Sequence, residues 1–155
     1  MKGNEKIIAK LNFLLADELT AISQYMVQAE MCANWGYAQL AEVIEKRAID
    51  EMKHAEKHIG RIIFLEGQPI VGELNKIRIG DSVEAHHKND WEAEKGAIQA
   101  YNEAIRLAVD IGDNGTREML DGILKDEEAH IDWIEAQLDQ IKQMGLQVYL
   151  AEQLS

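Results

Sequence analysis

The chain carries one arrangement of acidic, aromatic and histidine residues twice, with the two copies 76 residues apart. The matching pairs are Glu18 and Glu94, Tyr25 and Tyr101, Asp50 and Asp126, Glu51 and Glu127, and His54 and His130. In each copy a single glutamate precedes a Glu-x-x-His motif by 33 residues. This repeat predicts two similar helix hairpins, related by a pseudo-twofold axis, that present the same side chains in the same register.

Apolar residues around these positions recur at intervals of three and four, which is the spacing of the buried face of a helix. The first helix is predicted from Ile8 to a break at Asn34-Trp35-Gly36, and the second runs on to Leu65. Residues 67–80 contain three glycines, Gly67, Gly72 and Gly80, and the only proline of the chain, Pro69. They show no sustained helical period and are predicted to be a long connection.

The second half of the chain repeats the helix signals. Asp81-Ser82 can cap a third helix, residues 112–115 are predicted to be a turn, and Gly145 is predicted to end the fourth helix. The stretch from Leu146 to Leu150 is predicted to form a short fifth helix with its partner on another subunit.

The fold class follows from composition and connectivity. Aromatic residues make up 6% of the chain, and good helix formers dominate the rest, so we expect an all-α fold. At 155 residues, one domain spanning residues 1–155 is expected. Two short turns on either side of a long crossover between helices 2 and 3 are typical of a ferritin-like four-helix bundle.

Buried carboxylates require hydrogen bonds, counter-charges or a metal, so four glutamates on buried helix faces predict bound cations. A Glu-x-x-His motif places a carboxylate and an imidazole one turn apart on the same helix face. One glutamate from each of two helices, with one Glu-x-x-His from each of the others, is the ligand set of di-iron and di-manganese sites in helix bundles. The predicted ligands, which are also the predicted catalytic residues, are Glu18, Glu51, His54, Glu94, Glu127 and His130.

Carboxylates mixed with imidazoles suit iron or manganese, and the absence of thiolates argues against Fe–S clusters and structural zinc. Glu51 and Glu127 are assigned as bridges, because the histidine of the same motif caps one metal, and the two lone glutamates as terminal ligands. The alternative is a buried salt-bridge network, which needs several cations at that depth. The buried faces offer mainly Arg47 and Arg61.

Other residues near the ligands have two readings each. Tyr25 either hydrogen-bonds a ligand or is an ordinary core residue, and the aspartates at 50 and 126 either orient a histidine or lie exposed. A third Glu-x-x-His, from Glu84 to His87, lies at a helix start and is predicted to be at the surface.

The formal net charge of −12 disfavours binding to nucleic acid or to anionic membranes and favours cationic partners, although acidity also serves solubility. Cys32 is the only cysteine, so an intrachain disulfide is impossible and a reducing cytoplasm is expected. No run of 18 apolar residues and no cleavable leader is found, so neither a membrane span nor secretion is expected.

These motifs resemble a bacterioferritin along nearly the whole chain. The matching stretches are MKG at the start, DELTAISQY, IDEMKHAEKHI, FLEGQP, KDEEAHIDWIEAQL and MGLQVYL near the end. The resemblance implies iron storage and detoxification by a ferroxidase with two iron ions per subunit. Fe(II) would be oxidised by O2 or hydrogen peroxide, and a ferric mineral would form inside a homo-oligomeric shell of 24 subunits.

The resemblance also implies haem b, or a related iron porphyrin, shared between two subunits with Met52 of each as an axial ligand. Spacing alone places Met52 on a second apolar helix face, which a partner subunit would cover. A ferredoxin-type reductant for iron release is a further implied partner.

Some family members have a third iron site made by a histidine and an aspartate. The matching positions here are Lys46 and Asp50, which favours passage of iron through the di-iron centre instead.

Other functions stay open at the level of sequence. Rubrerythrin-like peroxidases and manganese catalases use similar helix bundles, although rubrerythrins usually add a cysteine-rich domain. A haem-binding or passive storage shell, in which the bundle site is only structural, belongs to a different class.

Overall fold

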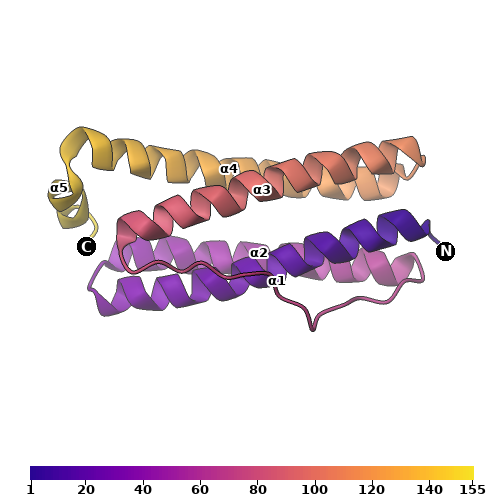
Figure 1. Ribbon diagram of the computed structural model, residues 1–155, viewed down its shortest axis with the longest axis horizontal. Helices are drawn as coiled ribbons and strands as arrows, with labels where there is room; N and C mark the ends of the chain where they lie inside the picture. Colours follow the sequence, from indigo (N-terminus) through magenta and orange to yellow (C-terminus); the bar gives the residue numbers. More distant parts are fainter.

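The computed structural model describes all 155 residues and is entirely helical apart from its connections. The helices are α1 (Glu5–Asn34), α2 (Ala38–Phe64), α3 (Val83–Asp110), α4 (Asn114–Met144) and the short α5 (Leu146–Ala151). Figure 1 shows α1 and α2 as one antiparallel hairpin and α3 and α4 as another, packed side by side. The predicted four-helix bundle with a long crossover and a short fifth helix is confirmed. None of the helices combines the length and the hydropathy needed to cross a bilayer.

Side-chain caps set where the helices begin. Asn4 accepts a hydrogen bond from the N–H of Lys6 at the start of α1, and Ser82 accepts one from the N–H of Ala85 at the start of α3. Asp113 accepts from the N–H of Thr116, so α4 already begins at Asn114. The predicted turn over residues 112–115 is therefore shorter than expected, because its second half is the first turn of a capped helix.

The crossover, residues 65–82, has no regular structure and is held along α1 by side-chain hydrogen bonds to its backbone. Asn12 donates to the carbonyl of Gln68 at 3.1 Å, and Gln28, further along α1, donates to the carbonyl of Ile79 at 3.0 Å. These bonds satisfy backbone groups that a segment outside helices leaves unpaired. Figure 1 shows the crossover returning the chain to the opposite end of the bundle, where α3 begins.

The apolar core is divided into two clusters. One lies near the start of α1 and includes Leu11 and Leu120, and the other lies near its end and includes Cys32 and Ile44. Between them the inward positions are occupied by buried glutamates and histidines. Burying so many charged groups in the middle of a bundle is costly, so this layer is where a function is to be sought.

Helix α5 folds back onto its own chain. Gly145, with φ at 84°, ends α4 in a conformation that suits glycine and lets the chain reverse. Tyr149 is thereby fully buried, while Val148 is left exposed. The predicted short helix is confirmed, and its main buried residue, Tyr149, packs within its own subunit.

Candidate metal centre

The six predicted ligands meet in the middle of the bundle. The lone glutamates come from α1 and α3, and the Glu-x-x-His motifs come from α2 and α4. The four carboxylates are at most 2% exposed. Their ligand atoms form two sets, each with all atoms within 4.8 Å of one another: Glu18, Glu51, His54 and Glu127, and Glu51, Glu94, Glu127 and His130. Glu51 and Glu127 belong to both sets, which is the arrangement expected of bridging carboxylates.

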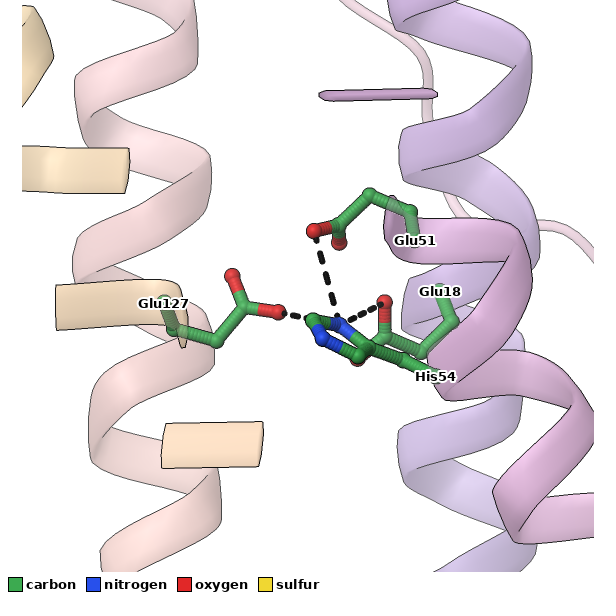
Figure 2. Close-up of side chains that lie close together, drawn as sticks. All are labelled: Glu18, Glu51, His54 and Glu127. Atoms are coloured by element: carbon green, nitrogen blue, oxygen red, sulfur yellow. Dashed lines mark ion pairs between the residues drawn. The ribbon is translucent and has the colours of Figure 1, made fainter. Parts of the chain in front are cut away.

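Both histidines point the Nδ1 atom into the cluster. His54 Nδ1 lies 3.0 Å from Glu127 Oε1, and 3.6 Å from both Glu18 Oε2 and Glu51 Oε1. Figure 2 shows Glu127 reaching this imidazole from the left, whereas Glu18 and Glu51 come from the helices on the right. In the second set, His130 Nδ1 lies 3.2 Å from Glu51 Oε1 and 3.5 Å from Glu94 Oε1. Each imidazole can therefore share one ion with the carboxylates around it.

The atoms that face the centre have no other hydrogen-bond partner. The unpartnered buried atoms are Glu18 Oε2, Glu51 Oε1, His54 Nδ1, Glu94 Oε2, both carboxylate oxygens of Glu127, and His130 Nδ1. Native proteins rarely leave a buried polar atom unpaired, and a whole group of such atoms is costly unless a cation binds to it. Carboxylate oxygens and imidazole nitrogens also suit iron and manganese, so these residues fit a pair of such ions.

The metal-free cluster holds protons. Burial and the neighbouring carboxylates raise the pKa of Glu51 well above its usual value and raise that of Glu94 to about 8. Burial alone would lower the pKa of the two histidines, but their bonds to Glu127 and to a second glutamate outweigh it. The pKa is about 11 for His54 and about 10 for His130. Metal ions must displace these protons in order to bind.

Two aspartates hold the histidines from outside. His54 Nε2 lies 2.9 Å from Asp126 Oδ2, and His130 Nε2 lies 3.4 Å from Asp50 Oδ2. Each aspartate belongs to the opposite hairpin from its histidine. A carboxylate at Nε2 keeps the proton there and leaves Nδ1 free to bind a metal. Both readings for these aspartates hold in part, because each contacts a histidine while its side chain stays 53% exposed at Asp126 and 36% exposed at Asp50.

The two tyrosines of the repeat also act across the hairpins. Tyr25 donates a hydrogen bond of 2.6 Å to Glu94 Oε1, and Tyr101 donates to Glu18 Oε1. Both hydroxyls thus hold one oxygen of a lone glutamate, which fixes the orientation of that carboxylate. Tyr25 therefore contacts a predicted ligand and is not simply a core residue.

The two arginines do not neutralise the carboxylates of the centre. Arg47 lies 3.8 Å from the fully buried Asp90 and over the rings of Tyr25 and Trp133. Arg61 is paired with Asp113 at the far end of the bundle. The alternative of a buried salt-bridge network therefore lacks arginine and lysine cations at the centre, and only protonated His54 and His130 could counter its four glutamates. Sequence reasoning missed Asp90, although its position one turn before a predicted ligand was a usable signal.

The third Glu-x-x-His motif was assigned to the surface, and for His87 this prediction is wrong. His87 is fully buried, with Nε2 3.0 Å from the hydroxyl of Tyr149 and its ring against the edge of Trp133. Glu84 is partly exposed and pairs with Lys88, so the motif does not converge on an ion. His87 is buried against Tyr149 of α5 and Trp133 of α4.

A cavity of about 330 Å³ between α1 and α3 gives access to the centre. All four glutamates line it, and Asp17, Lys76 and Glu92 line it as well. The cavity is large enough for small hydrated ions and small oxidants.

Residues predicted for other sites lie outside the centre. The side chain of Met52 is 44% exposed on α2. Lys46 is exposed as well, while Asp50 is engaged with His130.

Comparison with known proteins gives a consistent result. Residues 8–144 match the family model of the ferritin-like domain. A bacterioferritin of Rhodobacter capsulatus is 38% identical over 147 residues, covering 95% of this chain and 91% of the relative. A bacterioferritin of Brucella melitensis is 38% identical over 149 residues, covering 96% and 92%. A bacterioferritin of Mycolicibacterium paratuberculosis is 36% identical over 155 residues, covering 100% and 98%.

Proposed function

This chain belongs to the bacterioferritin family, and from that premise we propose that its buried cluster binds two Fe(II) ions and oxidises them as the first step of iron storage. The observation that carries this proposal is the pair of overlapping ligand sets that share Glu51 and Glu127. The seven buried, unpartnered ligand atoms that face the same space support it.

The ligands and the aspartates behind them would have different roles in this reaction. Two Fe(II) ions held side by side can together supply the two electrons that reduce O2 to hydrogen peroxide, or hydrogen peroxide to water. Glu51 and Glu127 would bridge the ions, and each histidine with the nearer lone glutamate would hold one of them. The aspartates at Nε2 fix the imidazoles, so the ligands need little rearrangement when ions enter.

Fe(II) and the oxidant would enter through the cavity between α1 and α3. Asp17 and Glu92 lie in its wall beside the glutamates of the centre. Their negative charges would concentrate cations there, in keeping with the net charge of the chain.

We further propose a shell of 24 identical chains that encloses a ferric mineral, with haem b bound between pairs of chains by Met52. The exposed thioether of Met52 lies near the exposed Ile49 on α2, as an interface position would require. A thioether is a suitable axial ligand for haem iron. A ferredoxin-type reductant would release the iron in the cytoplasm.

Iron would reach the mineral through the centre itself. The position matching a third iron ligand holds the exposed Lys46, and Asp50 is already bonded to His130. A manganese catalase or a rubrerythrin-like peroxidase could use the same ligand set, but the family favours iron. A passive shell would show no rapid oxidation.

Stopped-flow mixing of Fe(II) with O2 or hydrogen peroxide tests this function. The unaltered protein should show a rapid phase that saturates near two Fe(II) per chain, and Glu51→Gln should slow it at least about tenfold, since it loses a shared ligand. The matched control is Glu128→Gln, because Glu128 lies in the same α4 motif but is exposed. Equal rates in the two variants would contradict the proposal.

A further inference from the structure

The two halves of the centre repeat in their ligands and in the tyrosines and aspartates that contact them, but not in the residue behind Tyr101. Tyr101 and Tyr25 occupy equivalent positions and hold equivalent glutamates. Behind Tyr101 lies His58, whose equivalent in the second half of the chain is Ile134. The chemical symmetry of the centre therefore ends at the two tyrosines.

His58 completes a line of two hydrogen bonds that ends at Glu18. Its Nε2 lies 2.6 Å from the hydroxyl oxygen of Tyr101, and its ring stacks on the tyrosine ring. The single hydroxyl proton of Tyr101 is donated to Glu18, so Nε2 must carry a proton and donate it to the tyrosine oxygen. His58 Nδ1 has no partner, which suits an unprotonated nitrogen. Burial, with the nearby charges of His54 and Lys57, lowers the pKa of His58 to about 3, so it is neutral.

The hydrogen bond from His58 to Tyr101 should strengthen the one from Tyr101 to Glu18. A hydroxyl that accepts a hydrogen bond becomes a better donor, so Tyr101 should bind the ionised form of Glu18 firmly. Tyr101 occupies Oε1, while Oε2 has no hydrogen bond and lies 3.6 Å from His54 Nδ1. The free oxygen of Glu18 is thus directed at the same ion position as the histidine.

The other half is held differently. The Tyr25 hydroxyl has no hydrogen bond besides its bond to Glu94, and the Arg47 guanidinium lies over its ring at 5.3 Å. Tyr25 bonds to Oε1 of Glu94, the same oxygen that lies 3.5 Å from His130 Nδ1. Tyr25 thus bonds to the Glu94 oxygen that lies beside His130, whereas Tyr101 bonds to the Glu18 oxygen that does not lie beside His54; Oε2 of Glu94 has no hydrogen bond.

The two ligand histidines also differ in burial and in their outer hydrogen bonds. The side chain of His54 is 2% exposed and that of His130 is 11% exposed. The bond from His54 to Asp126 is 2.9 Å, against 3.4 Å from His130 to Asp50. Burial and outer hydrogen bonding both favour the His54 half.

We propose that the two metal positions are inequivalent: the position of Glu18 and His54 binds a divalent cation more tightly and fills first, and Tyr101 backed by His58 sets this difference. The inference rests on the proposed function, because it assumes that the cluster binds two ions. Tyr101 and His58 act here as positioning residues, through Glu18.

Titration of the metal-free assembled protein with Co(II), followed by its visible absorption and by calorimetry, tests the inference without any oxidation step. The unaltered protein should bind two ions in two separate steps. Tyr101→Phe should weaken the first step about tenfold or more, since a charge-assisted hydrogen bond is lost, and leave the second unchanged. The matched variant Tyr25→Phe should weaken only the second step.

Two variants of His58 separate positioning from damage to the fold. His58→Leu should weaken the first step by a smaller factor than Tyr101→Phe, and His58→Gln, which keeps an N–H donor, should restore most of the affinity. Circular dichroism should show all four variants folded. Equal affinity of the two positions in the unaltered protein, or equal effects of the two tyrosine variants on both steps, would overturn the inference. Binding of fewer than two Co(II) per chain would overturn the two-ion centre itself.

Discussion

At the scale of single residues, the main property of the metal-free centre is the protonation of its ligand side chains. His54 and His130 would be neutral near pH 7 in water, but bonds to buried glutamates keep both protonated. An imidazolium has no lone pair for a metal. The empty centre is thus electrically balanced by protons, and the loaded one by metal ions.

Metal binding should therefore release protons. Adding Zn(II) to the metal-free protein at pH 7 should release about two protons or more per chain, because both histidines, with pKa values of about 11 and about 10, must lose one each. For the same reason the affinity should rise as the pH is raised from 7 towards 10. A pH indicator in weakly buffered solution measures the release. Binding without proton release would show that the histidines are not ligands.

The aspartates behind the histidines should affect metal affinity from a distance. Asp126→Ala should weaken Zn(II) binding about tenfold, because outer partners of metal-binding histidines contribute about 10–100-fold. The effect of Asp50→Ala should be smaller, since its bond is longer. Asp132 is exposed on the same helix, and Asp132→Ala serves as the control in calorimetric titration. Identical affinities for Asp126→Ala and Asp132→Ala would rule out an orienting role.

At the scale of helices, structure could be predicted from the sequence wherever the apolar periodicity and the internal repeat indicated the same residues. The ligands could be predicted because each sits on a regular buried face and recurs 76 residues later. Helix starts were less predictable: α1 was expected from Ile8 but begins at Glu5, because the Asn4 cap adds most of a turn. Periodicity indicates which face is buried, whereas capping decides the first residue.

Burial by a distant element could not be predicted. His87 was placed at the surface because its neighbours in sequence are polar, yet Tyr149 covers it from 62 residues away. Whether α5 turns back onto its own chain depends on the backbone at Gly145, which no apolar period reveals.

The contact between α5 and the bundle should contribute measurably to stability. Tyr149→Phe removes bonds to His87 and Gln137 and leaves buried polar atoms unpaired, so it should destabilise the protein by about 1–3 kcal/mol. Thermal unfolding of the metal-free protein measures this. The exposed Gln147, also on α5, gives the control Gln147→Ala. No difference in Tm between the two variants would mean that α5 does not hold His87 in place.

At the scale of the whole molecule, the centre joins two hairpins whose apolar clusters lie on either side of it. Ions bound there connect α1 and α2 to α3 and α4, so loading should stabilise the bundle. Zn(II) at about 100 times its Kd should add about 2.7 kcal/mol to the free energy of unfolding. Thermal unfolding with and without Zn(II) measures the gain, which should be much reduced in Glu51→Gln. A similar rise in Tm in that variant would place the stabilising ions elsewhere.

The assembly of 24 subunits and the binding of haem are also predictions at the scale of the whole molecule. The native mass should approach that of 24 chains of 17.5 kDa each, and the isolated protein should carry haem. Met52→Leu keeps an apolar side chain at the interface position but lacks the sulfur, so it should assemble without haem and still oxidise Fe(II). Mass measurement and the haem absorption spectrum check both. Retention of haem by Met52→Leu would exclude Met52 as its ligand.

The most direct test of the two-ion centre is anomalous diffraction at the iron edge from crystals soaked with Fe(II) without oxygen. The proposed ligand set predicts two iron peaks per chain, both adjacent to Glu51 and Glu127, with His54 beside one and His130 beside the other. A single peak per chain, or iron bound only outside this cluster, would contradict it.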